Sequence, residues 1–96
     1  MPTFIMLSTL GPDGAATLRD NPDRIRAVTA EVEAMGVKVV AQYALLGDYD
    51  FLNIIEAPDE KSIARVAMTL SARGTLKTTT LTAIPVDEFI AGIKGS

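Results

Sequence analysis

The chain has 96 residues, a formal net charge of −3, a hydrophobic content of 48%, and neither His nor Cys. Their absence excludes a Ser-His-Asp triad, a cysteine nucleophile, thiolate or imidazole zinc sites and disulfide bonds. The acidic balance gives no basic surface for nucleic acid or an anionic membrane. We therefore expect one domain over residues 1–96, in the cytoplasm, with no metal, no cofactor, no nucleic-acid partner and no membrane span.

The first part of the chain predicts a strand, a loop and a helix. Residues 4–10 form a short apolar run rich in strand formers, which indicates the first strand. The following segment, Gly11-Pro12-Asp13-Gly14, has the composition of a turn, and we interpret it as a loop that could act as a flexible lid. Pro22 fits the first position of a helix and Gly36 fits its end, so a helix is predicted over residues 22–35.

The middle of the chain predicts an antiparallel hairpin. Residues 37–46 alternate in a way that leaves both faces of a strand largely apolar. Gly47-Asp48 suits a tight reversal, and residues 51–56 form the returning strand. Because both faces of this hairpin carry apolar side chains, we expect each face to contact something.

The last part of the chain predicts a helix, a strand and a short terminal helix. Ala57-Pro58-Asp59 begins the helix and Gly74 ends it, and residues 75–84 form a threonine-rich strand. Pro85 opens the terminal helix, for which residues 87–93 are predicted. Two sets of apolar residues fit helical spacing, namely Ile63, Val66, Ala67 and Leu70 in the first helix, and Phe89, Ile90 and Ile93 as docking residues in the second.

This order is β-α-β-β-α-β with an added C-terminal helix, the α+β, ferredoxin-like arrangement with a four-stranded antiparallel sheet. Right-handed crossovers place both main helices on one face of the sheet and leave the other face open. A monomer of this mass buries only about 64% of the surface of its unfolded chain, which is modest for so apolar a sequence. We therefore expect a second copy to cover the open face, giving a homodimer or larger homo-oligomer.

Several short motifs occur in one order along the chain: Asn21-Pro22-Asp23-Arg24-Ile25, then residues 43–50 with the sequence YALLGDYD, then residues 54–59, then Lys77-Thr78-Thr79-Thr80-Leu81. Together they resemble the GYD domain family over nearly the whole chain. The resemblance implies a dimeric α/β-barrel architecture similar to that of small monooxygenases and muconolactone isomerases. It implies no particular reaction.

The polar residues of the hairpin are the candidate catalytic groups, namely Tyr43, Asp48, Tyr49 and Asp50. A carboxylate there could act as a general base while a phenol orients an oxyanion. The alternative is that both Asp residues hold the turn through local backbone amides, which is common in hairpins. The candidate ligand-binding residues, which could surround a small-molecule pocket, are Phe4, Met6, Tyr43, Tyr49, Phe51 and Asn53.

Three functions are compatible with these residues. The sequence favours a homo-oligomeric binding protein that holds a small apolar or aromatic ligand between sheet and helices or in the dimer barrel. An alternative is a cofactor-free isomerase, cyclase or monooxygenase that uses Asp and Tyr groups. The absence of His disfavours that alternative, since His is the commonest general base. A purely structural oligomer is the third.

Overall fold

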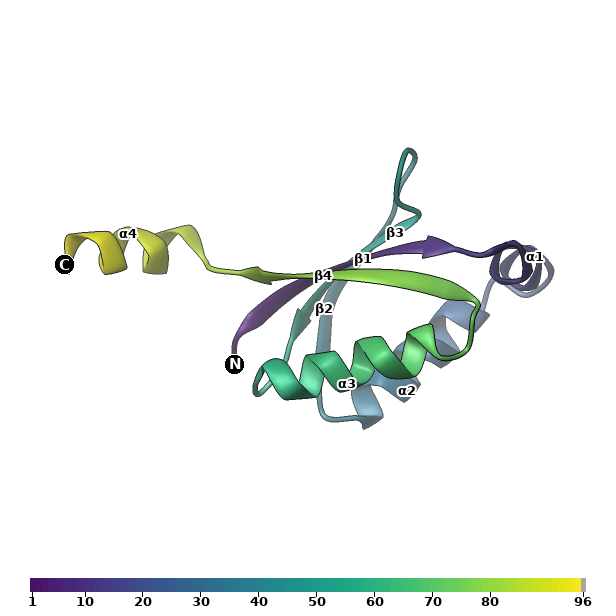
Figure 1. Cartoon of the computed structure of the whole chain (residues 1–96), viewed down its shortest axis with the longest axis horizontal. Helices are drawn as coiled ribbons and strands as arrows, with labels where there is room; N and C mark the ends of the chain where they lie inside the picture. The colour runs from purple at the N-terminus through teal and green to yellow at the C-terminus, as the bar shows by residue number, and fades with distance from the viewer. Residues whose placement is uncertain (96) are drawn as a thin grey trace.

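The computed structural model describes residues 1–95, which form one antiparallel sheet and four helices (Figure 1). The strand order in the sheet is β2-β3-β1-β4, so β1 lies in the centre beside β3 and β4. The predicted α+β fold with a four-stranded antiparallel sheet and a C-terminal helix is confirmed. In chain order the elements are β1 (Thr3–Leu10), α1 (Pro12–Asp20), α2 (Arg24–Ala34), β2 (Lys38–Ala44), β3 (Phe51–Glu56), α3 (Glu60–Ser71), β4 (Leu76–Ala83) and α4 (Val86–Lys94).

The strand register separates the sheet into a face covered by helices and an open face. On β1, Phe4, Met6 and Ser8 are buried on the helical side, and Ile5 and Leu7 point the other way. Figure 1 shows α2 and α3 on the same side of the sheet. The residues that form the core between the sheet and these helices are Phe4, Met6, Val32, Val37, Ile55, Ala57, Ile63, Val66 and Leu70.

Helix α3 follows the sequence pattern closely. The Asp59 carboxylate accepts hydrogen bonds from the Ser62 backbone amide and hydroxyl, both at 2.8 Å, and so caps the N-terminus of the helix. These two bonds stabilise the charged form and lower the pKa of Asp59 below its ordinary value of 3.8. The buried face of α3 is formed by Ile63, Val66 and Leu70, as predicted.

The interpretation of residues 11–14 as a loop is wrong, because α1 begins at Pro12 and runs to Asp20. Pro12 occupies the start of this helix, where its missing N–H costs nothing. Gly14 is buried, and a Cβ there would overlap the Thr75 carbonyl oxygen. The Gly11 amide donates to the same oxygen at 2.9 Å. Residues that suggest a turn therefore form a helix held tightly against the start of β4.

The reversal between β2 and β3 is longer than predicted. Strand β2 ends at Ala44, and the loop is closed by a 2.8 Å hydrogen bond from the Leu45 amide to the Asp50 carbonyl. Helix α2 begins at Arg24, two residues later than predicted. The turn before it is closed by a hydrogen bond from the Arg24 amide to the Asn21 carbonyl. The other predicted strands and helices agree with the structure to within one or two residues, which is the usual uncertainty of element ends.

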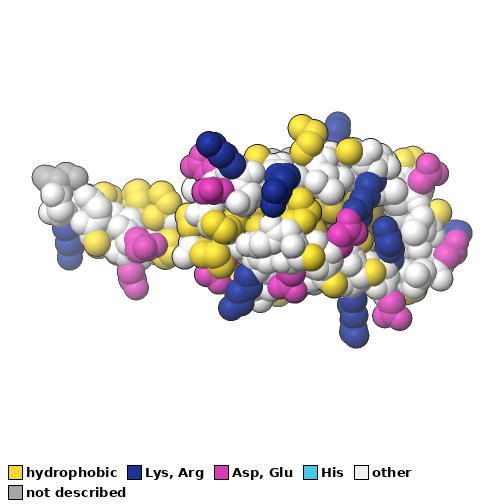
Figure 2. Space-filling view, turned by 90° about the horizontal axis from the view of Figure 1, so that it is seen from below, with side chains coloured by type: hydrophobic (Ala, Val, Ile, Leu, Met, Phe, Trp, Pro, Cys, Tyr) yellow, Lys and Arg dark blue, Asp and Glu magenta, His cyan; other side chains and the backbone are white. Residues whose placement is uncertain are grey.

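Helix α4 projects from the end of β4, away from the rest of the chain (Figure 1). Its predicted docking residues Phe89, Ile90 and Ile93 are 54%, 42% and 61% exposed, so their docking surface does not lie within the described part of the same chain. Figure 2 shows hydrophobic side chains gathered on this projecting segment. The radius of gyration is 14.7 Å, against about 12.5 Å for a compact domain of this length.

The accessible surface reflects the same open shape. It amounts to 6455 Å², whereas a compact monomer of this mass exposes about 5,300 Å².

Among the described residues, no helix has both the length and the apolar character needed to cross a bilayer.

Candidate functional site

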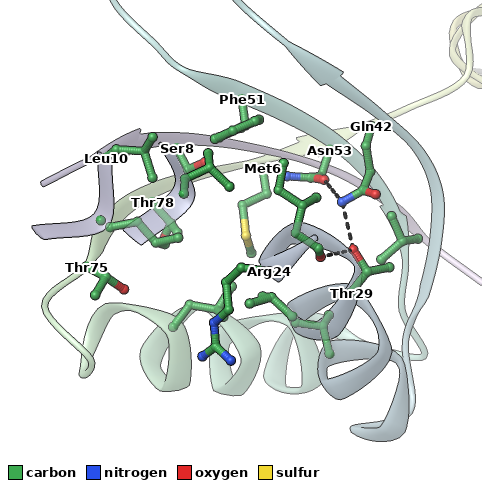
Figure 3. A pocket seen from close by; sticks show the side chains of 18 of the residues that line it. Met6, Ser8, Leu10, Arg24, Thr29, Gln42, Phe51, Asn53, Thr75 and Thr78 are labelled. Carbon is green, nitrogen blue, oxygen red and sulfur yellow. Dashed lines mark hydrogen bonds between the residues drawn. The ribbon is translucent and has the colours of Figure 1, made fainter. Parts of the chain in front are cut away.

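A cavity of about 690 Å³ lies between the helical face of the sheet and helices α1, α2 and α3 (Figure 3). Its walls are mainly apolar and come from both layers. The sheet contributes Met6, Leu10, Phe51 and Ile55, and the helices contribute Leu18, Ile25, Val28, Val32, Val66 and Leu70. This volume lies within the range of about 300–1,000 Å³ typical of small-molecule sites.

One wall of the cavity carries a connected set of polar side chains (Figure 3). The Gln42 Nε2 group donates to Asn53 Oδ1 at 2.9 Å and to Thr29 Oγ1 at 3.0 Å. The Thr29 hydroxyl in turn donates to the Ile25 carbonyl at 2.9 Å. These bonds tie β2 and β3 to α2, and they use both Nε2 protons of Gln42 and the hydroxyl proton of Thr29.

Ser8 differs from these polar residues because its hydroxyl is unpaired. The residue is 5% exposed and lines the cavity from β1. Its carbonyl accepts a hydrogen bond from the Asp50 amide, but its hydroxyl has no partner among residues 1–95. With no partner in the described part of the chain, this hydroxyl offers a donor and an acceptor to whatever occupies the cavity.

The charged residues that line the cavity are both cationic. They are Arg24 from the start of α2 and Arg73 from the end of α3, and no carboxylate of residues 1–95 lines the cavity. Arg73 forms an ion pair with Glu31, whereas Arg24 has no ion pair within the described part of the chain. Arg24, which is exposed, is therefore the one cation of the lining without an ion pair among the described residues.

The structure brings four of the predicted ligand-binding residues to this cavity. Met6, Phe51 and Asn53 line it from the helical face of the sheet, and Tyr43 lines it while being 57% exposed. Phe4 instead lines a smaller cavity of about 440 Å³ beneath α3, where the buried Thr80 hydroxyl also has no partner among the described residues. Tyr49 lines neither cavity.

The predicted catalytic residues do not converge. The Asp50 carboxylate accepts a hydrogen bond from the Leu10 amide at 2.7 Å, which ties the hairpin to the end of β1. Asp48 and Tyr49 lie in the same loop and do not line the cavity. Figure 1 shows this loop projecting from the sheet on the side away from α2 and α3. The geometry thus gives Asp50 a structural contact, as in the alternative interpretation of the hairpin.

Sequence reasoning missed the helical side of the site. Arg24 and Thr29 both belong to α2, and their position above the sheet depends on how α1 and α2 pack. Ser8 had a usable signal, because it shares its side of β1 with Phe4 and Met6. Within residues 1–95 no three Asp or Glu side chains cluster in a way that could hold a metal ion.

The chain is similar to known proteins over most of its length. The model of the GYD domain matches residues 4–93. A Thermus thermophilus protein named "Glutamine synthetase and cystathionine beta-lyase binding protein" is 57% identical over 95 residues, which covers 98% of this chain and 100% of the relative.

Two solved structures share the fold at low sequence identity. One is TTHA0845 from Thermus thermophilus, with a TM-score of 0.57 and 22% identity over 88% of this chain and 95% of that chain. The other is FFRP-DM1, with a TM-score of 0.54 and 23% identity over 88% of this chain and 100% of that chain. With the family model matched across residues 4–93, the chain belongs to the GYD domain family.

Proposed function

We propose that this chain is a binding protein that attaches to metabolic enzymes, with glutamine synthetase and cystathionine beta-lyase as the first candidate partners. The observation that carries this proposal is the relative named for binding these two enzymes, which is 57% identical and aligns with 98% of this chain. The alignment leaves out almost none of either chain, so every segment that the relative could use for contact has an aligned segment here. The cytoplasmic location expected from the sequence is part of the same proposal.

The surface supports a function in protein association. Helix α4 presents Val86, Phe89, Ile90 and Ile93 on one side at the spacing of a helical stripe, and all four are exposed. Exposed apolar stripes of this kind are typical of segments that pack on another protein. The projecting helix therefore offers a contact surface for an enzyme or for a second copy of the chain.

Co-elution of purified proteins tests the enzyme-binding function. The chain is mixed with glutamine synthetase or cystathionine beta-lyase from the same organism and separated by size. We expect the chain to shift into the enzyme's elution volume, and a Phe89→Ser and Ile93→Ser double variant shows whether α4 contributes. If the chain elutes alone with both enzymes at tens of micromolar, the proposal fails.

Homodimer formation through the open face of the sheet completes this proposal. The open face consists of the apolar side chains Ile5, Leu7, Leu52, Ile54 and Leu81, which the register places on the side away from α2 and α3. No described element of the same chain covers this face (Figure 1). A second copy packed sheet to sheet would remove these side chains from water, and the apolar composition supports this arrangement.

Light scattering after size exclusion measures the assembly. We expect a mass of at least twice the 10.2 kDa of one chain at micromolar concentration. Leu7→Glu places a charge at the centre of the open face and should yield a folded monomer, whereas Ala30→Glu, on the exposed side of α2, should leave the dimer intact. A wild-type mass of one chain would contradict the dimer.

A second candidate function, the binding of a small molecule, is favoured by the cavity. Its volume of about 690 Å³, its apolar walls and the unpaired Ser8 hydroxyl are the features expected of a small-molecule site. Native mass spectrometry of the freshly purified chain should detect a bound molecule that leaves on denaturation. A chain that carries none and that binds no member of the probe panel described below would refute this function.

A further inference from the structure

We propose that the cavity between the sheet and helices α1, α2 and α3 takes a small carboxylic acid with an apolar body, which pairs with Arg24 and hydrogen-bonds to Ser8. This inference rests on the ligand-binding function proposed above and specifies its ligand class. Ser8 lines the cavity from β1, and Arg24 lines it from the start of α2, with its guanidinium on the side of the helices (Figure 3), so the two contacts would hold opposite ends of a ligand.

The apolar side chains of the cavity walls indicate that the ligand has an apolar body. Met6, Leu10, Phe51 and Ile55 from the sheet face Ile25, Val28 and Val32 from α2 and Val66 and Leu70 from α3. Filling such a space with hydrocarbon or an aromatic ring removes apolar surface from water on both partners. A ligand that is polar along its whole length would leave its groups unpaired against these walls.

The charges of the lining residues indicate that the ligand carries an anionic group. Arg24 is the unpaired cation of the lining, whereas nearby Arg19 and Arg73 pair with Asp20 and Glu31. Among the described residues no carboxylate lines the cavity, so no lining group competes for the Arg24 guanidinium or repels an incoming anion. A guanidinium also matches a carboxylate through two parallel hydrogen bonds, a geometry that a neutral amide or an amine cannot reproduce.

The second contact follows from the unpaired hydroxyl. Ser8 is only 5% exposed, and its hydroxyl can both donate and accept a hydrogen bond. In the neighbouring polar wall the Gln42 and Thr29 donors are already used within the chain. We therefore expect the ligand to carry a second polar atom, such as a ring nitrogen, a hydroxyl or a carbonyl, within its apolar body.

A matched panel of small molecules tests the proposal on the full-length chain. Three carbon bodies (hexyl, phenylbutyl and indolylpropyl) are each titrated as the carboxylic acid, the primary amide and the amine, with binding followed by calorimetry and ligand-observed NMR. We expect at least one acid to bind and its amide and amine to bind more weakly. Charge-assisted hydrogen bonds predict a difference of about ten- to hundredfold.

Variants then locate the contacts. Arg24→Gln should weaken binding of the acid by about ten- to hundredfold and remove its advantage over the amide. Arg26→Gln is the matched control, because Arg26 lies on the same helix and does not line the cavity. Ser8→Ala should weaken binding of the indolylpropyl acid by about two- to tenfold, and circular dichroism confirms that each variant is folded.

The outcomes separate this inference from the function on which it rests. If no member of the panel binds and native mass spectrometry detects no bound molecule, both the ligand-binding function and the ligand class are wrong. If native mass spectrometry detects a bound molecule but no acid of the panel binds, only the ligand class is wrong. If an amide or amine binds as tightly as its acid, or if Arg24→Gln and Arg26→Gln behave alike, the cavity binds a ligand but the carboxylic acid class is wrong.

Discussion

The substitution Gly14→Ala tests whether α1 is held against the start of β4 by the absence of a side chain. An added Cβ would overlap the Thr75 carbonyl oxygen and lie 3.1 Å from its carbon, with Leu10 Cδ2 at 3.4 Å. The Thr75 carbonyl is backbone and is also fixed by the Gly11 amide, so it cannot move aside cheaply. The helix itself would have to shift, together with the part of the cavity that Gly14 lines.

The magnitude follows from two opposing effects. Overpacking of this kind costs about 1–3 kcal/mol, whereas Ala in place of Gly within a helix gains about 0.5–1 kcal/mol when nothing obstructs it. The close contact should win because the overlap is with backbone. For a domain of this size each 1 kcal/mol moves the melting temperature by roughly 4–8 °C, so we expect a drop of several degrees or more.

Thermal unfolding by circular dichroism at one fixed protein concentration measures this effect. Gly92→Ala is the matched control, since an added Cβ there meets nothing within 4 Å, and it should leave the melting temperature unchanged or raise it. A Gly14→Ala protein that melts at or above the wild-type temperature would show that α1 does not lie this close to Thr75.

Substitutions at two further positions, Asp59 and Asp50, test contacts made by carboxylates. Because the folded state lowers the pKa of Asp59, this group contributes stability above its ordinary pKa of 3.8, and the contribution is lost as the pH falls through the lowered value. Asp59→Ala should therefore lower the melting temperature at pH 7 and flatten the acid end of the stability curve, whereas Asp59→Ser, which keeps a cap, should lose less. An unchanged curve for Asp59→Ala would contradict the cap. Asp50→Ala should cost about 1–3 kcal/mol in urea unfolding because it leaves the Leu10 amide unpaired, and Asp50→Asn should cost less because it keeps an acceptor. Equal stability of Asp50→Ala and the wild type would show that the hairpin does not depend on this bond.

Local sequence patterns correctly predicted the elements for which local conformational preference and tertiary packing favour the same structure. The apolar run of residues 4–10 correctly predicted β1, which the structure places at Thr3–Leu10. The break at Ala57-Pro58-Asp59 and the apolar stripe predicted α3 with nearly correct ends. In each case the local preference and the tertiary packing favour the same structure, which is when such reasoning succeeds.

The prediction was wrong for residues 11–14, where a contact with a residue distant in sequence determines the local structure. Gly11 to Gly14 has turn composition, but its position against Thr75, far along the chain, makes it the start of α1. No pattern within the segment reveals that contact. The same limit applies to α4, whose apolar stripe is predicted correctly but whose docking surface lies outside the described part of the chain.

The structure places four of the predicted ligand-binding residues, Met6, Tyr43, Phe51 and Asn53, in the lining of the cavity. Met6, Phe51 and Asn53 reach the cavity because parity along a strand fixes the face of each residue. Arg24 could not be placed, because the position of α2 over the sheet depends on the three-dimensional packing of α1 and α2. The polar groups of the hairpin made Asp48 and Asp50 candidates. In the structure Asp50 accepts a hydrogen bond from the Leu10 amide, and neither residue lines the cavity.

Calorimetric titration of the purified chain into purified glutamine synthetase, both from the same organism, tests the proposed enzyme-binding function most directly. The Thermus thermophilus relative, titrated into the glutamine synthetase of its own organism under the same conditions, is the positive control. We predict saturable heat with a fixed number of chains per enzyme subunit for both pairs. Saturable heat from the relative and none from this chain, with cystathionine beta-lyase giving the same result, would contradict the proposed function.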